Sequence, residues 1–404
     1  MTVFFNIKFV FILLCAFYYF KQINAQENLH FIDIVKSHGY PTEVYEVETE
    51  DGYLLDIFRV PFGRNSTTKV PNRYPLLLAH GLMGSAENFI IGGPTKALTY
   101  VLADHGYDVW AFNARGTWHS RKHRTLDPDI DMREFWRFTW HEIGYYDIPA
   151  TIDFILNVTN AAKLHYIGHS QGTTVFFVAM SERPEYNSKI NVMIGMGPSA
   201  LLSHIKQPFL KFMAPMFKYL QNLAESLKVY EMIPKNLLSN DAVRLLANSF
   251  CDEKPPARAL CSNALAAMAG FTEEQLDPDT INFIVSIGPG GASVYQGLHY
   301  AQLVQTGKFM NYDWGPKENK KRYNSSTPPE YNFSNIICPI SLMYGKEDIL
   351  IAEEDVIELA TRLPNVIDVY KVPYEHWSHM DFVWAKDVGK YINKHIFRVL
   401  RKFN

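Results

Sequence analysis

Hydrophobic and polar positions alternate in two early segments of the chain that flank a short polar turn. The segments run from Thr42 to Thr49 and from Tyr53 to Val60, and Asp51-Gly52 lies between them. A period of two residues is typical of strands with one buried face, and Asp-Gly favours a tight hairpin turn. The pattern therefore predicts a β-hairpin at the start of a sheet.

The next hydrophobic runs are apolar on both faces, which is typical of parallel strands covered by helices on each side. Helical patterns near Pro94 to His105 and near Tyr145 to Val158 lie between runs. This alternation predicts a doubly wound α/β domain with a mostly parallel sheet. The predicted strands are Pro75–Ala79, Tyr107–Phe112, Leu164–Ile167 and Ile190–Met196.

The regular alternation stops after Pro198. Residues 203–329 contain helical stretches rich in Met, Phe and Leu, then a Gly-rich turn and a polar segment. The alternation resumes afterwards, so we expect an α/β core of residues 26–202 and 330–404 that carries residues 203–329 as an inserted helical subdomain. The resumed elements are predicted as strand Ile336–Tyr344, helix Glu353–Leu363, strand Val366–Val372 and a C-terminal helix from about Asp381.

The N-terminus has the organisation of a secretory signal peptide. Lys8 precedes an apolar run from Phe9 to Phe20, and Ala25 is the small final residue that signal peptidase prefers. An apolar helix of about 12 residues spans about 18 Å, too little for a hydrocarbon core of about 30 Å. Residues 1–25 are therefore predicted to be removed on export, to the outside of the cell or to lysosomes. We expect no stable transmembrane anchor in the remaining chain.

Cysteines and sequons agree with export. After loss of Cys15, Cys251 and Cys261 remain in a polar segment that can close a loop, whereas Cys338 lies in an apolar strand pattern and is interpreted as a buried thiol. Without a CxxC pair we predict no zinc site, and we expect no cofactor. The N-x-S/T sequons are at Asn65, Asn157, Asn324 and Asn332.

The net charge of −3 gives no electrostatic reason to expect a nucleic-acid partner. The candidate chemistry lies instead in Gly168-His169-Ser170-Gln171-Gly172, which follows a predicted strand and precedes a helical run. This is the context of a nucleophile elbow. The turn is so tight that residues two positions either side of Ser170 must be small, which explains the two glycines.

A serine nucleophile needs a histidine base and a carboxylate that fixes the tautomer of the base. After such an elbow, the acid and then the histidine are expected near the ends of late strands. Asp348 follows the strand ISLMYG, with Glu347 as the alternative acid, and the base is His376 or His379 within EHWSHMDF. Spacing alone does not separate the two histidines. Two further acids are predicted on a helix face and on a strand surface, namely Asp355 and Asp368.

An acyl-transfer site also needs donors for the oxyanion of the tetrahedral intermediate. One predicted donor is the backbone N–H of Gln171, directly after the nucleophile. The second is the N–H of Leu82, in the loop that follows the strand Pro75–Ala79. His80 and His169 are predicted to have positional and packing roles.

Together these segments resemble the lysosomal and gastric acid lipases, which are α/β-hydrolases, over nearly all of the chain after the signal peptide. The resemblance implies a Ser170, Asp348 and His379 triad with oxyanion donors at Leu82 and Gln171. It also implies a disulfide between Cys251 and Cys261. The segments that carry it are LLLAHGLMGSAENF, NARG, GYYDIPATIDFIL, YIGHSQGTT, YGKEDILIAEEDV and HMDFVWAKD.

The chain departs from the family pattern at three places near the site. Thr117 stands where the family has the Asn of R-G-N, Lys346 replaces the second glycine before the acid, and Glu347 directly precedes Asp348. None of these departures changes a residue of the predicted triad.

The inserted block favours a lipid substrate. Asp348 follows Ser170 by 178 positions, whereas a bare core needs on the order of 60 to 80 residues there. Amphipathic helices above a serine site predict a cap and lid over an apolar acyl pocket that opens at a lipid–water interface. The predicted function is a lipase for neutral lipid esters, triacylglycerol or cholesteryl ester. The alternatives are a carboxylesterase for smaller esters, a peptidase or thioesterase, and a catalytically silent lipid-binding protein.

Overall fold

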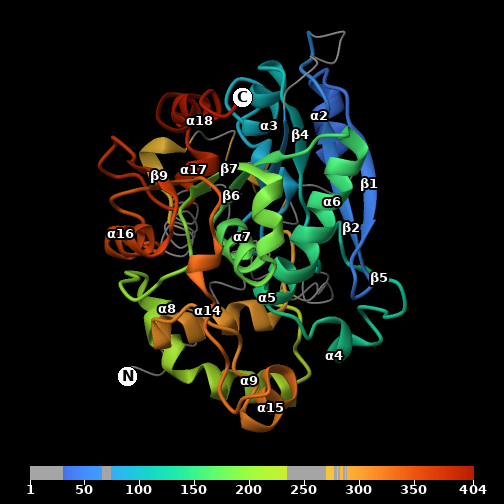
Figure 1. The fold of residues 1–404 in the computed structure, drawn as a ribbon, viewed down its shortest axis with the longest axis vertical. Helices are drawn as coiled ribbons and strands as arrows, with labels where there is room; N and C mark the ends of the chain where they lie inside the picture. Colours follow the sequence, from blue (N-terminus) through green and yellow to red (C-terminus); the bar gives the residue numbers. More distant parts are fainter. Residues whose placement is uncertain are drawn as a thin grey trace, which may run out of the picture.

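The computed structural model describes residues 31–65, 74–233, 270–276, 280, 283–284, 287 and 289–404. Within them, nine strands form one sheet in the order β1-β2-β4-β3-β6-β7-β8-β9, with β5 beside β2. Figure 1 shows this sheet with helices on both sides. The strands are β1 (Glu43–Glu48), β2 (Tyr53–Val60), β3 (Pro75–Ala79), β4 (Asp108–Ala111), β5 (Lys122–His123), β6 (Leu164–His169), β7 (Ile190–Met196), β8 (Ile340–Tyr344) and β9 (Val366–Lys371).

Strand directions agree with the sequence pattern. β1 and β2 form the predicted antiparallel hairpin, and β2 also pairs antiparallel with β4. From β4 through β3, β6, β7, β8 and β9, every neighbouring pair is parallel. The predicted α/β class with a mostly parallel sheet is therefore confirmed.

Side chains alternate between two hydrophobic clusters on opposite faces of the sheet. On β3, Leu77 and Ala79 belong to one cluster, whereas Leu76 and Leu78 belong to the other. Because both faces are covered by helices, the strand is apolar throughout. The first cluster includes residues of α6 (Ile148–Thr159), α7 (Gln171–Glu182) and α16 (Glu353–Arg362), and the second includes residues of α2 (Phe31–Ser37), α3 (Leu98–Asp104) and α18 (Lys394–Leu400).

Two predicted element starts were wrong. The predicted strand at Ile336 begins only at Ile340, because the Asn187 side-chain oxygen accepts hydrogen bonds from the N–H groups of Ile337 and Cys338 (2.8 and 3.1 Å). The helix predicted from Pro94 begins at Leu98. Residues 94–96 form a separate turn, and Ala97, directly before the helix, has an extended ψ of 139° that separates this turn from the helix.

The C-terminal helix is also not continuous as predicted. α17 (Asp381–Trp384) ends at Ala385, whose ψ of 143° is extended. There the N–H of Lys386 donates to the carbonyl oxygen of Gln275, outside any helix. The chain becomes helical again in a π-helical turn (Gly389–Asn393) that leads into α18.

Residues between β7 and β8 supply a group of helices at one end of the molecule, the lower end in Figure 1. α14 contacts both α8 and α9, and its His299 ring stacks on Trp140 of the core at 3.5 Å between centroids. No helix in the described ranges is long and apolar enough to cross a bilayer. The group consists of α8 (Pro208–Met213), α9 (Phe217–Ser226), α14 (Val294–Thr306) and α15 (Pro316–Tyr323).

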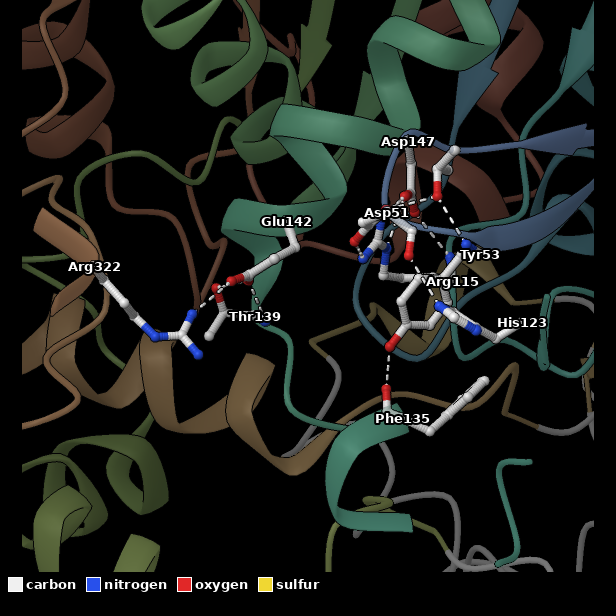
Figure 2. A network of polar contacts seen from close by, with 10 residues as sticks. Asp51, Tyr53, Arg115, His123, Phe135, Thr139, Glu142, Asp147 and Arg322 are labelled. Atoms are coloured by element: carbon white, nitrogen blue, oxygen red, sulfur yellow. Dashed lines mark hydrogen bonds and ion pairs between the residues drawn. The ribbon is translucent and has the colours of Figure 1, made fainter. Parts of the chain in front are cut away.

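A buried arginine holds the loop after β4 against the hairpin and against the π-helical turn (Ile143–Asp147) that leads into α6. Figure 2 shows the Arg115 guanidinium between Asp51 and Asp147, above the ring of Tyr53. It forms hydrogen bonds with both oxygens of Asp51 (2.5 and 2.8 Å), and its Nε donates to Asp147 at 2.7 Å. The side chains of Arg115 and Asp147 are 1% and 0% exposed, so water cannot solvate either charge if the ion pair is broken.

Replacing Arg115 with Met is expected to lower the free energy of unfolding by about 3–5 kcal/mol, because a buried carboxylate loses its counter-charge. Denaturant titration followed by tryptophan fluorescence measures this change. Arg124→Met is the matched control: its ion pair with Glu48 is exposed, so the loss should stay below about 1 kcal/mol. Equal losses in both variants would contradict a structural role for the buried cluster.

Candidate active site

The candidate site lies at the carboxyl ends of the parallel strands. Ser170 directly follows β6, and Leu82 lies in the loop after β3. Asp348 and His379 lie in the loops after β8 and β9. Because parallel strands end at the same edge of a sheet, these loops meet there. The predicted disulfide residues Cys251 and Cys261, and the predicted signal peptide 1–25, lie outside the described residues.

The Ser170 turn has the strained geometry that the sequence motif predicts. Ser170 has φ +52° and ψ −121°, a region that costs a non-glycine residue about 1–3 kcal/mol. Its N–H donates to the Met196 carbonyl at 2.9 Å, and its own carbonyl accepts from the Thr173 N–H at 2.8 Å. A Cβ on Gly168 would lie 2.7 Å from the Gly172 carbonyl carbon, and one on Gly172 would overlap the carbonyl oxygen of Ala79. The two glycines therefore let the turn form.

Asp348 and His379 form a buried pair. The side chain of Asp348 is 0% exposed and that of His379 is 2% exposed. His379 Nδ1 lies 2.8 Å from Asp348 Oδ2, so Nδ1 carries the proton and donates it. The other carboxylate oxygen accepts from the N–H groups of Leu350 and Ile351 (2.9 and 2.8 Å). His379 Nε2 is buried and has no hydrogen-bond partner among the described residues, which leaves its lone pair for a proton from a reacting group.

The rival histidine pairs with the rival acid at the surface. His376 Nδ1 lies 3.1 Å from Glu347 Oε2, and the two side chains are 54% and 52% exposed. The hydrogen bond to Glu347 raises the pKa of His376. Sequence spacing left both histidines as candidate bases, whereas the structure pairs each with a different acid. Of the two pairs, only Asp348–His379 is buried. The other acids have different partners: Asp355 bonds His204, and Asp368 bonds His395.

The loop after β3 approaches the serine closely. A Cβ on Gly81 would lie 3.5 Å from Ser170 Oγ, so Leu82 follows a residue that borders the nucleophile. Gln171 is the first residue of α7, and a helix leaves the first N–H groups without an intrahelical partner. His80 holds the loop: its Nε2 accepts from the Ala114 N–H at 3.2 Å, so its Nδ1–H donates to the Gly81 carbonyl at 2.8 Å. Burial lowers the pKa of His80 to about 4, which keeps this ring neutral.

Two side chains hold the His379 loop in place. His169 Nε2 donates to the His379 carbonyl at 3.0 Å, and burial lowers the pKa of His169 to about 3. His169 is therefore a neutral support and not a base. Asp381 accepts hydrogen bonds from the N–H of Ser378 (2.8 Å) and from the N–H and hydroxyl of Thr272 (3.0 and 2.7 Å). Burial raises the pKa of Asp381 to about 6.

Sequence reasoning missed Gln296, whose Nε2 donates to Gln171 Oε1 at 3.1 Å. The signal was the Ser293-x-x-Gln296 pattern of a capping box, which locates the start of a helix. The box is present at the start of α14, but nothing local to it indicates the contact with Gln171. Within the described ranges, no group of three or more His, Cys, Asp or Glu side chains is arranged to hold a metal ion.

Comparison with known proteins shows the family to which the chain belongs. Residues 31–93 match the family described as a partial alpha/beta-hydrolase lipase region, and residues 74–385 match the alpha/beta hydrolase fold. Lipase 3 of Drosophila melanogaster is 37% identical over 91% of this chain and 92% of its own length. Gastric triacylglycerol lipase of Mus musculus is 37% identical over 93% of each chain. The chain belongs to the acid lipase family of α/β-hydrolases.

A solved structure from Sulfolobus solfataricus is similar in fold, with a TM-score of 0.56 at 13% identity over 90% of this chain and 94% of its own. In the described part of the chain, none of the three departures from the acid lipase pattern forms a hydrogen bond or ion pair with Asp348 or His379. The Thr117 hydroxyl donates to the Ala114 carbonyl at 2.8 Å. Lys346 pairs with Glu375, and Glu347 with His376, in both cases at the surface.

We expect His379→Ala to lower the rate of ester hydrolysis by about 10⁴-fold or more, because members of a catalytic triad act as a unit. His376→Ala should stay within about threefold of the parent, because an exposed ion pair contributes little. Single-turnover kinetics on both variants, after circular dichroism shows that both are folded, gives the comparison. An active His379→Ala beside an inactive His376→Ala would reverse the assignment.

Proposed function

We propose that this acid lipase hydrolyses carboxylic esters of neutral lipids through Ser170, Asp348 and His379. The observation that carries the proposal is the buried Asp348–His379 pair, which lies at the same edge of the sheet as Ser170. His379 Nε2 has no hydrogen-bond partner among the described residues. An imidazole with Nδ1–H bound to a carboxylate is the tautomer in which Nε2 is the proton acceptor.

In the proposed reaction, Ser170 Oγ attacks the ester carbonyl carbon while its proton moves to His379 Nε2. The carbonyl oxygen becomes an oxyanion, which accepts hydrogen bonds from the N–H groups of Leu82 and Gln171. When the tetrahedral intermediate collapses, the ester C–O bond breaks and the imidazolium protonates the leaving alcohol. Water then attacks the acyl-enzyme with the same histidine as base, and the fatty acid and free Ser170 are released.

The helices between β7 and β8 support a lipid substrate and a cap subdomain of residues 203–329. They present large apolar side chains to solvent, and exposed apolar side chains of this size are suited to contact other apolar surfaces. Tyr219, Leu223 and Leu227 recur at intervals of four residues, so they share one face of α9 and its C-terminal end. An aggregated lipid is the substrate form that this surface fits. The exposed fractions are Phe212 58%, Tyr219 66%, Leu223 41% and Leu227 64%.

The relatives support a neutral lipid ester as the substrate. Gastric triacylglycerol lipases are 37% identical to this chain over nearly its full length, so we infer a triacylglycerol or cholesteryl ester as the substrate. The alternatives are a carboxylesterase for smaller esters, a peptidase or thioesterase, and a silent lipid-binding protein, because the triad alone does not determine the leaving group.

We also propose export through a signal peptide at residues 1–25, to the outside of the cell or to lysosomes. All four sequon asparagines lie at exposed positions, as glycosylation requires, including Asn157 near the end of α6. Cys338 is buried, and burial raises the pKa of its thiol to about 12. This thiol is therefore inert, which supports pairing of Cys251 with Cys261. The other three sequons are Asn65, Asn324 and Asn332.

Hydrolysis of triolein, tributyrin, cholesteryl oleate and a soluble p-nitrophenyl ester by purified protein, from about pH 4 to 8, tests the proposed function. We expect emulsified long-chain esters to be turned over faster than the soluble ester, and Ser170→Ala to be inactive on all four while it is still secreted. Turnover by Ser170→Ala would refute the mechanism. Preference for the soluble ester would favour the carboxylesterase, and inactivity of the parent protein would favour lipid binding alone.

A surface variant separates lipid binding from chemistry in the same assay. Phe212→Lys should reduce triolein hydrolysis several-fold more than hydrolysis of the soluble ester, because it places a charge at an exposed apolar position of α8. The control is Ile337→Lys. Ile337 is similarly exposed, at 61% against 58% for Phe212, but it lies before β8, at the opposite end of that strand from Asp348. Equal losses on both substrates would show that Phe212 has a structural role only.

A further inference from the structure

One short segment forms hydrogen bonds with residues at both proposed oxyanion donors: with Met83, which follows Leu82, and with Gln171. We call residues 289–296 the α14 entry segment, since it leads into α14 and ends in its first turn. It comes from the region between β7 and β8, more than a hundred residues along the chain from Leu82 and from Gln171. Local sequence therefore does not bring these parts together, and only the folded structure does.

The segment binds the loop that contains Leu82 through backbone hydrogen bonds. The Gly290 N–H donates to the carbonyl of Met83, the residue after Leu82, at 2.7 Å. The Gly290 carbonyl in turn accepts from the Trp118 N–H at 2.7 Å. Met83 has φ +58°, a strained value for a non-glycine residue. The Gly290 bond thus holds the strained residue that directly follows Leu82.

The fit around Gly290 is too close for any side chain. A Cβ on Gly290 would overlap the carbonyl oxygen of Gly84 and lie 3.1 Å from Ser85 Cβ. The next residue, Gly291, has φ +92°, and a Cβ there would lie 2.6 Å from the Gly116 carbonyl oxygen. The two glycines therefore lie between the loop after β3 and the loop after β4.

The segment binds Gln171 through the side chain of Gln296. Its Oε1 accepts from the Ser293 N–H at 2.8 Å, which fixes the orientation of the amide and directs Nε2 to Gln171 Oε1 at 3.1 Å. Gln171 and Gln296 are each 2% exposed and Ser293 is 0% exposed. The Ser293 hydroxyl donates to the Trp136 carbonyl at 2.6 Å. Water cannot replace these bonds, so each side chain has one position.

We propose that Gln296 and Gly290 are positioning residues that align the two oxyanion donors, Gln171 N–H and Leu82 N–H, from a single segment. The proposal rests on the proposed function, because it takes those two N–H groups as the donors. Neither positioning residue contacts substrate. Gln296 acts through the side chain of Gln171, and Gly290 acts through the carbonyl of Met83.

The test uses kcat and KM on a soluble ester, so that binding to a lipid surface does not enter. Loss of one oxyanion donor lowers kcat by about 10²–10³-fold, and misalignment should cost part of that. We expect Gln296→Leu to lower kcat by about 10-fold with KM within about twofold, and Gly290→Ala to lower kcat by about 10²-fold. Gly297→Ala is the matched control, because a Cβ there meets only the Met232 side chain, at 3.4 Å or more.

A double-mutant cycle identifies the route of action. If Gln296 acts through Gln171, then Gln296→Leu should cost less than about twofold in a Gln171→Met background. Additive losses, a change confined to KM, or parental kcat in Gln296→Leu would overturn the proposal. Those results, with the parent and Gly297→Ala active, would leave the proposed function intact. A parent without esterase activity would instead refute the proposed function, and with it the donors that Gln296 is said to align.

Discussion

The site depends on one close backbone approach, where α7 begins against the end of β3. Gly172 lies so near the Ala79 carbonyl that no side chain fits, and this contact sets the distance between the serine turn and the loop that begins at His80. Ser170 then has a positive φ, which bends the chain sharply between β6 and α7. The strain is small beside the free energy contributed by the neighbouring apolar strands, because every residue of β3, β6 and β8 is buried.

From this contact outward, the site is held by layers of backbone and buried side-chain hydrogen bonds. His80 joins the loop after β3 to the loop after β4, and Arg115 joins that loop to the hairpin and to the π-helical turn before α6. His169 joins the serine turn to the His379 loop. Because these groups are buried and neutral or fully paired, their positions do not depend on solvent. The donors and the base are thereby oriented before any substrate arrives, which is the condition for electrostatic stabilisation of an oxyanion.

Much of the fold could be predicted from sequence because its signals are local. Strands that are apolar on both faces, the Asp51-Gly52 turn and the Gly-x-Ser-x-Gly motif each specify structure within a few residues. The predicted start of α3 was wrong because residues 94–96 form a separate turn that ends at Ala97, whose backbone is extended. The start of β8 was wrong because a distant side chain, Asn187, binds the backbone there. The histidines of EHWSHMDF were ambiguous because both lie in one loop, and only tertiary pairing with Asp348 or Glu347 separates them. Gln296 was missed for the same reason, since its partner is far away in sequence.

The central claim is that Ser170 is the nucleophile activated by the buried pair, and covalent trapping tests it most directly. The protein is treated with an active-site-directed organophosphate such as diethyl p-nitrophenyl phosphate, and the adduct is located by peptide mass mapping while loss of esterase activity is followed. The account predicts one equivalent of phosphoryl group per chain, all of it on the peptide that contains Ser170, with activity lost in proportion. Full loss of activity with the label on another residue, or full activity with Ser170 labelled, would contradict it.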